Sequence, residues 1–378
     1  MLRARRSLDT ALDITRVDAR LRDILRLGVY QLRRLDRIPR HAAVSTSVEL
    51  ARATAGEAAA RYVNQALRKV SVQAGGGERG AVASHPDWLV ARWRERFGEA
   101  ETAHLVAWND RRPKLILQPA QWDLATLRLR LEGAGYRVED APFGAGLSII
   151  RTPTAPRSPL PAGLPGYPEG AFIVQDPAQV LVCRFAAVPR GARLYDACAA
   201  PGGKAVMLTL RGARVTAGDR RPERLTRLAE TARRVKVPVP IVAADLEAAP
   251  WAAGTWDTVL VDAPCSATGT MARHPDARWR VTPRAIARLA ERQSRLLDAA
   301  AILVRPGGIV VYATCSLEAE ENENQVNAFL SRHSAFERRP VADSVPAGLI
   351  TSAGDFQALP WRHHIDGAYA ARLERRHA

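Results

Sequence analysis

The sequence contains little cysteine and no long apolar run. Four cysteines among 378 residues are too few for a disulfide scaffold. The cysteines, Cys183, Cys198, Cys265 and Cys315, include no C-x-x-C pair, so we expect no zinc or other metal site. No stretch approaches the roughly 20 apolar residues of a membrane span, and the N-terminus lacks a secretory signal pattern. We therefore expect a cytoplasmic protein, without membrane association, whose cysteines act as thiols.

Acidic residues are also under-represented relative to basic ones. The chain has 55 Lys and Arg against 39 Asp and Glu, which gives a net charge of +16. Residues 1–70 carry +8 of this charge and residues 171–378 carry +7, while residues 71–170 are almost neutral. A positive excess at both ends favours a polyanionic partner, most simply nucleic acid.

The N-terminal 70 residues have a helical pattern. Apolar residues from Leu21 to Leu35 recur at steps of three and four with arginines between them, which predicts an all-α domain with basic outer faces. Pro39 ends the first long helix in this prediction. Ser45 or Thr46 would cap the next one.

The middle of the chain predicts a connecting subdomain. A glycine-containing linker over residues 71–84 separates the helical domain from residues 85–168. That segment begins with an amphipathic helical stretch and continues with a small α/β unit up to residue 150. A proline-rich stretch then leads into the last domain.

Residues 171–378 change to short apolar strand candidates that alternate with helical runs. The candidate strands are residues 193–196, 214–219, 241–245, 258–262 and 309–312. This alternation predicts a doubly wound, mostly parallel α/β sheet. Ligands of such sheets bind at the carboxyl ends of the strands, where the sequence places Asp196, Asp219, Asp245 and Asp262. A final strand is expected near residues 366–369.

One strand-to-helix segment has the composition of a cofactor loop. In Asp196-Ala-Cys-Ala-Ala-Pro-Gly-Gly-Lys204, two glycines let a ligand approach the backbone at a helix N-terminus. Asp219 follows the strand-end acid by 23 residues, an offset that suits ribose hydroxyls. The segment is neither a P-loop nor G-x-G-x-x-G, so an adenosine cofactor without pyrophosphate, S-adenosyl-L-methionine, fits best. A purely structural turn would explain the glycines but not the strand-end acids.

Two cysteines follow predicted strand ends, in Asp262-Ala-Pro-Cys265 and Thr314-Cys315-Ser316. A thiolate there could add to C6 of a pyrimidine, after which C5 can accept a methyl group. An acid such as Asp262 would stabilise the charge that develops on the base. Spacing alone does not choose the nucleophile. Cys183 has no such placement and is predicted to lie in the core.

These motifs resemble those of RNA (cytosine-5) methyltransferases. The likeness rests on the Asp196–Lys204 segment, both cysteine motifs and the following Glu320-Glu321-Asn322-Glu323. The run Cys265–Trp279 is similar to bacterial members that act on 16S ribosomal RNA. Residues 1–70 resemble a NusB-like helical RNA-binding domain, which we expect to be truncated at its N-terminal end.

The resemblance implies a Rossmann-like methyltransferase domain that uses S-adenosyl-L-methionine. Cys315 would be the nucleophile and Cys265 would assist product release. Cofactor contacts would come from Cys198, Ala199, Ala200, Pro201, Gly202, Gly203, Lys204, Asp219, Asp245 and Asp262. The expected partner is 16S rRNA, with cytosine 967 as the target, or a small-subunit assembly intermediate.

The chain is expected to be a monomer. Arg273 and Arg278, which follow the Pro-Cys segment, are candidate RNA contacts. Two alternatives stay open. One is a non-catalytic, RNA-binding ribosome-assembly factor with a vestigial cofactor domain. The presence of all four strand-end acids and both strand-end cysteines argues against this alternative. The other is a tRNA cytosine-5 methyltransferase.

Overall fold

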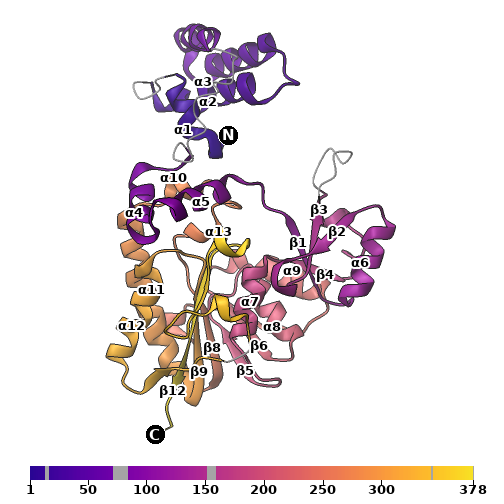
Figure 1. Cartoon of the computed structure of the whole chain (residues 1–378), viewed down its shortest axis with the longest axis vertical. Coiled ribbons are helices and arrows are strands. Elements are labelled where there is room, and N and C mark those ends of the chain that lie inside the picture. The colour runs from indigo at the N-terminus through magenta and orange to yellow at the C-terminus, as the bar shows by residue number, and fades with distance from the viewer. Residues whose placement is uncertain (13–16, 71–83, 151–158, 342–343, 378) are drawn as a thin grey trace. The chain divides into compact units, whose positions relative to one another are not determined.

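The computed structural model describes residues 1–12, 17–70, 84–150, 159–341 and 344–377. The chain forms two compact units (Figure 1). The first contains Met1–Arg111 and His274–Trp279, and the second contains Arg112–Arg273 and Arg280–Ala378. Residues 71–83 of the predicted linker and 151–158 of the proline-rich stretch lie outside the described residues. The domain boundaries expected from the sequence stay a prediction. Within the described ranges, no helix has the length and apolar character needed to cross a membrane.

The first unit is helical. Its α-helices are α1 (Arg5–Thr10), α2 (Ala19–Arg34), α3 (Arg40–Lys69), α4 (Asp87–Phe97) and α5 (Glu99–Asp110), and α10 (Ala277–Arg280) begins within the segment that returns to it. A short 3-10 turn, Leu2–Ala4, precedes α1. Leu25 and Val29 of α2 pack with Val63 and Leu67 of α3 in a closed apolar core. The three- and four-residue periodicity is therefore confirmed as helical.

The predicted cap of the second long helix is wrong. α3 begins at Arg40, directly after Pro39, which takes the N-cap position with an extended backbone. Thr46 lies one and a half turns further on, and its hydroxyl donates to the Ala42 carbonyl at 2.8 Å inside the helix. Proline suits the position ahead of a helix because it has no N–H to leave unsatisfied.

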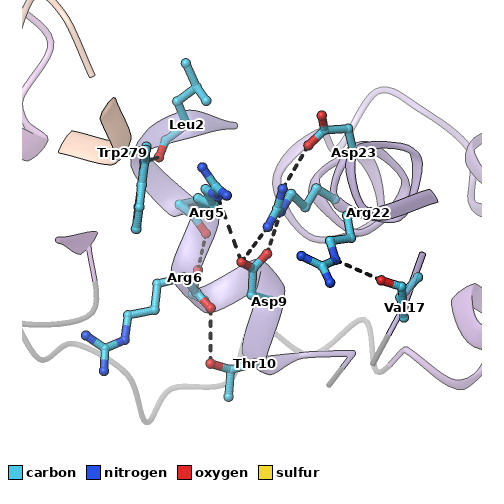
Figure 2. Close-up of polar contacts among 12 residues, drawn as sticks. Leu2, Arg5, Arg6, Asp9, Thr10, Val17, Arg22, Asp23 and Trp279 are labelled. Carbon is cyan, nitrogen blue, oxygen red and sulfur yellow. Dashed lines mark hydrogen bonds and ion pairs between the residues drawn. The ribbon is translucent and has the colours of Figure 1, made fainter. Parts of the chain in front are cut away.

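A half-buried ion pair joins the first two helices of this unit. Arg26 of α2 donates to Asp9 of α1 at 2.6 Å and to Asp23 at 2.9 Å. Figure 2 shows the two carboxylates, Asp9 and Asp23, with Arg5 and Trp279 nearby. Close by, the Arg5 guanidinium lies 5.0 Å from the ring centroid of Trp279, whose indole N–H donates to the Leu2 carbonyl at 2.9 Å. The contacts of Trp279 with Arg5 and Leu2 attach the 274–279 segment to the start of the chain.

The second unit begins with a small antiparallel sheet. Its strands lie in the order β2 (Arg137–Asp140), β3 (Leu147–Ile150), β1 (Leu115–Pro119) and β4 (Phe172–Val174). Helix α6 (Leu124–Gly133) packs Leu127 and Leu131 against Leu117 and Leu147 of this sheet. The small α/β unit predicted up to residue 150 is thus confirmed.

The main sheet has the strand order β10-β12-β9-β8-β5-β6-β7, with β11 paired to β12. The parallel strands are β5 (Arg193–Asp196), β6 (Arg214–Asp219), β7 (Ile241–Ala243), β8 (Trp256–Asp262) and β9 (Val304–Thr314). Strands β10 (Phe336–Arg338), β11 (Phe356–Ala358) and β12 (Ala368–Arg375) add antiparallel pairs at one side. The doubly wound α/β prediction is confirmed, as is the final strand.

Alternating side chains give the main sheet two cores. Leu194 faces a core formed with α7 (Pro177–Phe185), α8 (Gly203–Leu210) and α9 (Pro222–Arg234). Its neighbour Tyr195 faces the other core, formed with α11 (Pro283–Leu303) and α12 (Glu323–Arg332). The strand order reverses between β5 and β8. A crevice opens at such a reversal, beyond the carboxyl ends of the strands.

Candidate active site

A cavity of about 540 Å³ lies at the carboxyl ends of the parallel strands. Its volume is in the range of small-molecule and cofactor sites. It is lined by three carboxylates (Asp219, Asp245, Asp262), three thiols (Cys198, Cys265, Cys315) and five arginines (Arg220, Arg221, Arg224, Arg280, Arg292), together with smaller apolar residues. Three of the four sequence-predicted acids and both strand-end cysteines are therefore brought together in one cavity.

The segment between β5 and α8 forms a tight turn beside this cavity. Gly202 is the N-cap of α8 and has a left-handed backbone (φ 105°), and a Cβ there would lie 2.5 Å from Cγ of Leu228. Only glycine therefore fits this position. From the predicted loop, Cys198 and Ala200 line the cavity, whereas Ala199, Pro201, Gly202, Gly203 and Lys204 are not among the residues that line it.

Each of the lining acids is fixed by a different local contact. Asp219 accepts the backbone N–H of Arg221 at 2.9 Å and the guanidinium of Arg224 at 3.2 Å. Asp245 accepts the backbone N–H of Glu247 at 3.2 Å. The Arg224 side chain also donates to the Ala200 carbonyl at 2.9 Å, so it ties the acid of β6 to the turn after β5.

Lys204 is paired with Asp262 behind the cavity wall. The Lys204 ammonium donates to Asp262 Oδ2 at 2.7 Å and also to the Gln179 side chain. Burial opposes the charge on Lys204, but the Asp262 carboxylate outweighs burial and raises the pKa of the lysine. Lys204 therefore contacts the site through Asp262.

Asp196 ends β5 as predicted, but it differs from the other strand-end acids in its surroundings. Its side chain is fully buried, and it is not among the residues that line the cavity. Burial, and then the charge of Asp262, raise the pKa of Asp196 to about 8 from an ordinary value of 3.8.

We expect Asp196→Asn to change how stability depends on pH. Because the folded-state pKa lies above the unfolded-state value, ionisation favours the unfolded chain as pH rises from about 4 to about 8. The variant should lack this pH-dependent loss of stability. Its free energy of unfolding, relative to that of the parent chain, should therefore increase between pH 5 and pH 9. Urea titrations across this range measure the difference. A difference that does not vary with pH would show that Asp196 is not a raised-pKa group.

The two strand-end thiols are in direct contact. The parallel register of β8 and β9 pairs Asp262 with Ala313, which brings the following segments side by side. Sγ of Cys265 lies 3.2 Å from Sγ of Cys315, and the backbone N–H of Cys315 donates to the Cys265 sulfur at 3.3 Å. Both cysteines are free thiols.

The surroundings of the cysteines favour a proton on Cys265. Its hydrogen bond to Cys315, its burial and the nearby charges of Cys315 and Glu321 raise the pKa of Cys265 well above its usual value. Cys183 is buried in α7, and burial raises its pKa to about 12, which confirms its prediction as a core residue.

The structure does not support the candidate RNA contact at Arg278. Its side chain is completely buried in the first unit, where it donates to Asp110 at 2.7 Å and to the Ser84 carbonyl at 3.2 Å. Arg273 is held by Asp176 at 2.6 Å and by Asp366 at 2.7 Å. Both arginines follow the Pro-Cys segment closely in sequence, but their carboxylate partners lie more than 90 residues away along the chain.

Sequence reasoning missed two groups of residues at this site. The cavity arginines Arg280 and Arg292 have no motif that separates them from arginines on a solvated helix face. Glu321 lies in a quoted motif, but its burial between the two cysteine segments has no sequence signal.

Comparison with known families agrees with this architecture. Residues 187–374 match the model of the 16S rRNA methyltransferase RsmB/F family, and residues 5–72 match the NusB family. A probable ribosomal RNA small subunit methyltransferase B from Synechocystis is 35% identical over 94% of this chain and 83% of its own length. A ribosomal RNA small subunit methyltransferase B from Xylella fastidiosa is 37% identical over 95% and 84%.

The chain belongs to the RsmB/F methyltransferase family. The crystal structure of a protein called PH0851 superposes with a TM-score of 0.82 at 25% identity, over 97% of this chain and 85% of that one. The structure of NSun6 from Pyrococcus horikoshii with SFG shares the fold, with a TM-score of 0.67 at 19% identity over 78% of this chain and 99% of that one.

The family's methyl donor, S-adenosyl-L-methionine, fits the residues of this cavity. Asp219 and Asp245 offer carboxylate oxygens to hydroxyl groups at the ends of β6 and β7. The NusB-like N-terminal domain and the Rossmann-like methyltransferase fold are both confirmed.

Proposed function

We propose that this chain methylates C5 of a cytosine in 16S rRNA, through a transient bond between Cys315 and C6 of the base. The observation that carries the proposal is the contact of two free thiols, 3.2 Å apart, in the same cavity as the strand-end acids. The family resemblance assigns the nucleophile to Cys315 and the target to cytosine 967. A raised pKa lowers the thiolate fraction of Cys265, which suits a role in product release better than nucleophilic attack.

In the proposed reaction, the Cys315 thiolate adds to C6 and makes C5 electron-rich. S-Adenosyl-L-methionine, when bound, supplies the electrophilic methyl group to C5. Asp262, whose side chain is one-third exposed, holds the nucleobase, and the Lys204 ammonium paired with it offsets the negative charge that develops there. A general base then removes the proton from C5. The C5–C6 double bond re-forms, and the C–S bond breaks with its electron pair on the sulfur of Cys315. Cys265, in contact with that sulfur, assists this release.

The cytosine must leave its stack to reach this cavity, which costs a few kcal/mol. The lining arginines Arg280 and Arg292 offer positive charge to the phosphates that flank such a nucleotide. The net positive charge of residues 1–70 would add contacts to the RNA backbone, so binding should weaken with added salt. Action as a monomer in the cytoplasm stays a prediction.

A methyl-transfer assay with mapping of the product tests this function. Labelled S-adenosyl-L-methionine is supplied with naked 16S rRNA, with small-subunit assembly intermediates and with tRNA, and bisulfite sequencing locates 5-methylcytosine. We expect a single modified cytosine in 16S rRNA, at position 967. Binding of 16S rRNA without transfer would favour the non-catalytic assembly factor. Transfer to tRNA alone would favour the tRNA enzyme.

A further inference from the structure

Glu321 is a fully buried carboxylate between the segments that carry the two thiols. Its Oε1 accepts the backbone N–H of Ser266 at 2.9 Å, and its Oε2 accepts the hydroxyl of Ser316 at 2.5 Å. The Ser266 hydroxyl donates to Oε2 as well. Ser266 directly follows Cys265, and Ser316 directly follows Cys315. One side chain therefore bonds the residue after each cysteine.

Further contacts hold Glu321 itself in place. Gln293 of α11 donates to Glu321 Oε1 at 3.1 Å and to the Pro264 carbonyl at 2.9 Å, so it braces the Pro-Cys segment from the other side. The Tyr312 hydroxyl donates to the Glu321 carbonyl at 2.6 Å. Burial raises the pKa of Glu321, and the hydrogen bonds from Ser266 and Ser316 oppose that rise.

We propose that Glu321 is a positioning residue that holds Cys265 and Cys315 in contact by bonding the segment that follows each of them. The inference rests on the proposed function for its catalytic meaning, but the positioning itself does not depend on it. Glu321 is not among the residues that line the cavity, so it acts through the cysteine segments.

A carboxylate suits this position because the surrounding groups are donors. A backbone N–H, two hydroxyls and a glutamine amide converge on the two oxygens of Glu321. Carboxylate oxygens only accept, and hydrogen bonds to a charged acceptor are stronger than neutral ones. Glutamine has the same shape, but one of its two ends would present N–H groups to these donors.

The test measures thiol proximity without using activity. A trivalent phenylarsenical oxide condenses with two neighbouring thiols, forms two As–S bonds and releases water. The parent chain should bind one equivalent tightly, and Cys265→Ser should lose this binding. Glu321→Gln should weaken the affinity about tenfold or more, as expected for a lost hydrogen bond to a charged group. The matched control Glu320→Gln changes the neighbouring, half-buried carboxylate and should bind like the parent.

Kinetics provide the second arm. Glu321→Gln should lower kcat about tenfold while the KM for S-adenosyl-L-methionine stays within about twofold, because Glu321 does not reach the cavity. Glu321→Ala, which leaves the donors without an acceptor, should have the larger effect if it folds. A folded Glu321→Gln with parental arsenical affinity and parental kcat would overturn the positioning role. Arsenical binding by the parent with no methyl transfer to any RNA would instead contradict the proposed function.

Discussion

Replacement of Cys315 by serine is expected to reduce methyl transfer to 16S rRNA by at least about a thousandfold, since loss of a nucleophile removes the step on which the reaction depends. A serine hydroxyl is almost entirely protonated near neutral pH, so it cannot replace the thiolate. The change is nearly isosteric, and cofactor binding and the unfolding temperature should stay close to those of the parent. Initial rates with labelled donor at saturating RNA measure the loss.

Cys265→Ser is the matched variant for this experiment, because its sulfur lies 3.2 Å from that of Cys315 at the same cavity. If Cys265 assists release, this variant should still form the bond to the base but turn over slowly. A covalent protein–RNA complex should then accumulate and survive denaturation. Full activity of Cys315→Ser together with complete loss in Cys265→Ser would assign the nucleophile to the other cysteine.

The second large effect concerns the buried pair behind the cavity wall. Asp262→Ala leaves the ammonium of Lys204, whose side chain is 9% exposed, without its carboxylate. Removal of one partner of a buried pair costs about 3–5 kcal/mol of stability. Because Asp262 is partly exposed, we expect the free energy of unfolding to fall by about 3 kcal/mol. Chemical denaturation without cofactor measures the change in the free energy of unfolding.

A double variant separates the structural role of Asp262 from its chemical role. Lys204→Met combined with Asp262→Ala removes both charges and should return stability to within about 1 kcal/mol of the parent. Methyl transfer should stay low, because the pair of Asp262 and Lys204 that holds the nucleobase and offsets its charge is missing. Asp245→Ala is the control, since Asp245 lies on the same cavity and its ion pair with the half-exposed Arg220, at 3.9 Å, is long. Equal destabilisation by Asp262→Ala and Asp245→Ala would contradict the importance of the buried pair.

The sequence was sufficient to predict the parallel strands of the main sheet and the edge at which several acids and two cysteines meet. Apolar runs that end in Asp219 and Asp262 mark parallel strands, because buried parallel strands are continuously apolar and their carboxyl ends meet at one edge. The cysteines after β8 and β9 are placed at the same edge by that rule. Their contact at 3.2 Å depends on the register of β8 against β9, which a single sequence does not show.

Pairings across long stretches of sequence explain the remaining differences. Asp196 ends its strand like the other acids, but its burial depends on how the neighbouring strands and helices close over it. Arg278 looks like a surface arginine until Asp110, 168 residues earlier in the chain, is seen beside it. The same holds for Glu321, which bonds Ser266 across 55 residues. Local patterns predict elements, whereas these contacts are set by the fold.

The covalent bond to the base can be tested most directly with a substrate that traps it. In RNA that carries 5-fluorocytidine at the target position, fluorine replaces the proton that must leave C5, so the bond between sulfur and C6 persists after methyl transfer. Mass spectrometry of the digested complex then identifies the modified peptide. We predict that the adduct is on Cys315 and that it requires S-adenosyl-L-methionine. An adduct on Cys265, or methylated RNA with no adduct on either cysteine, would contradict the account.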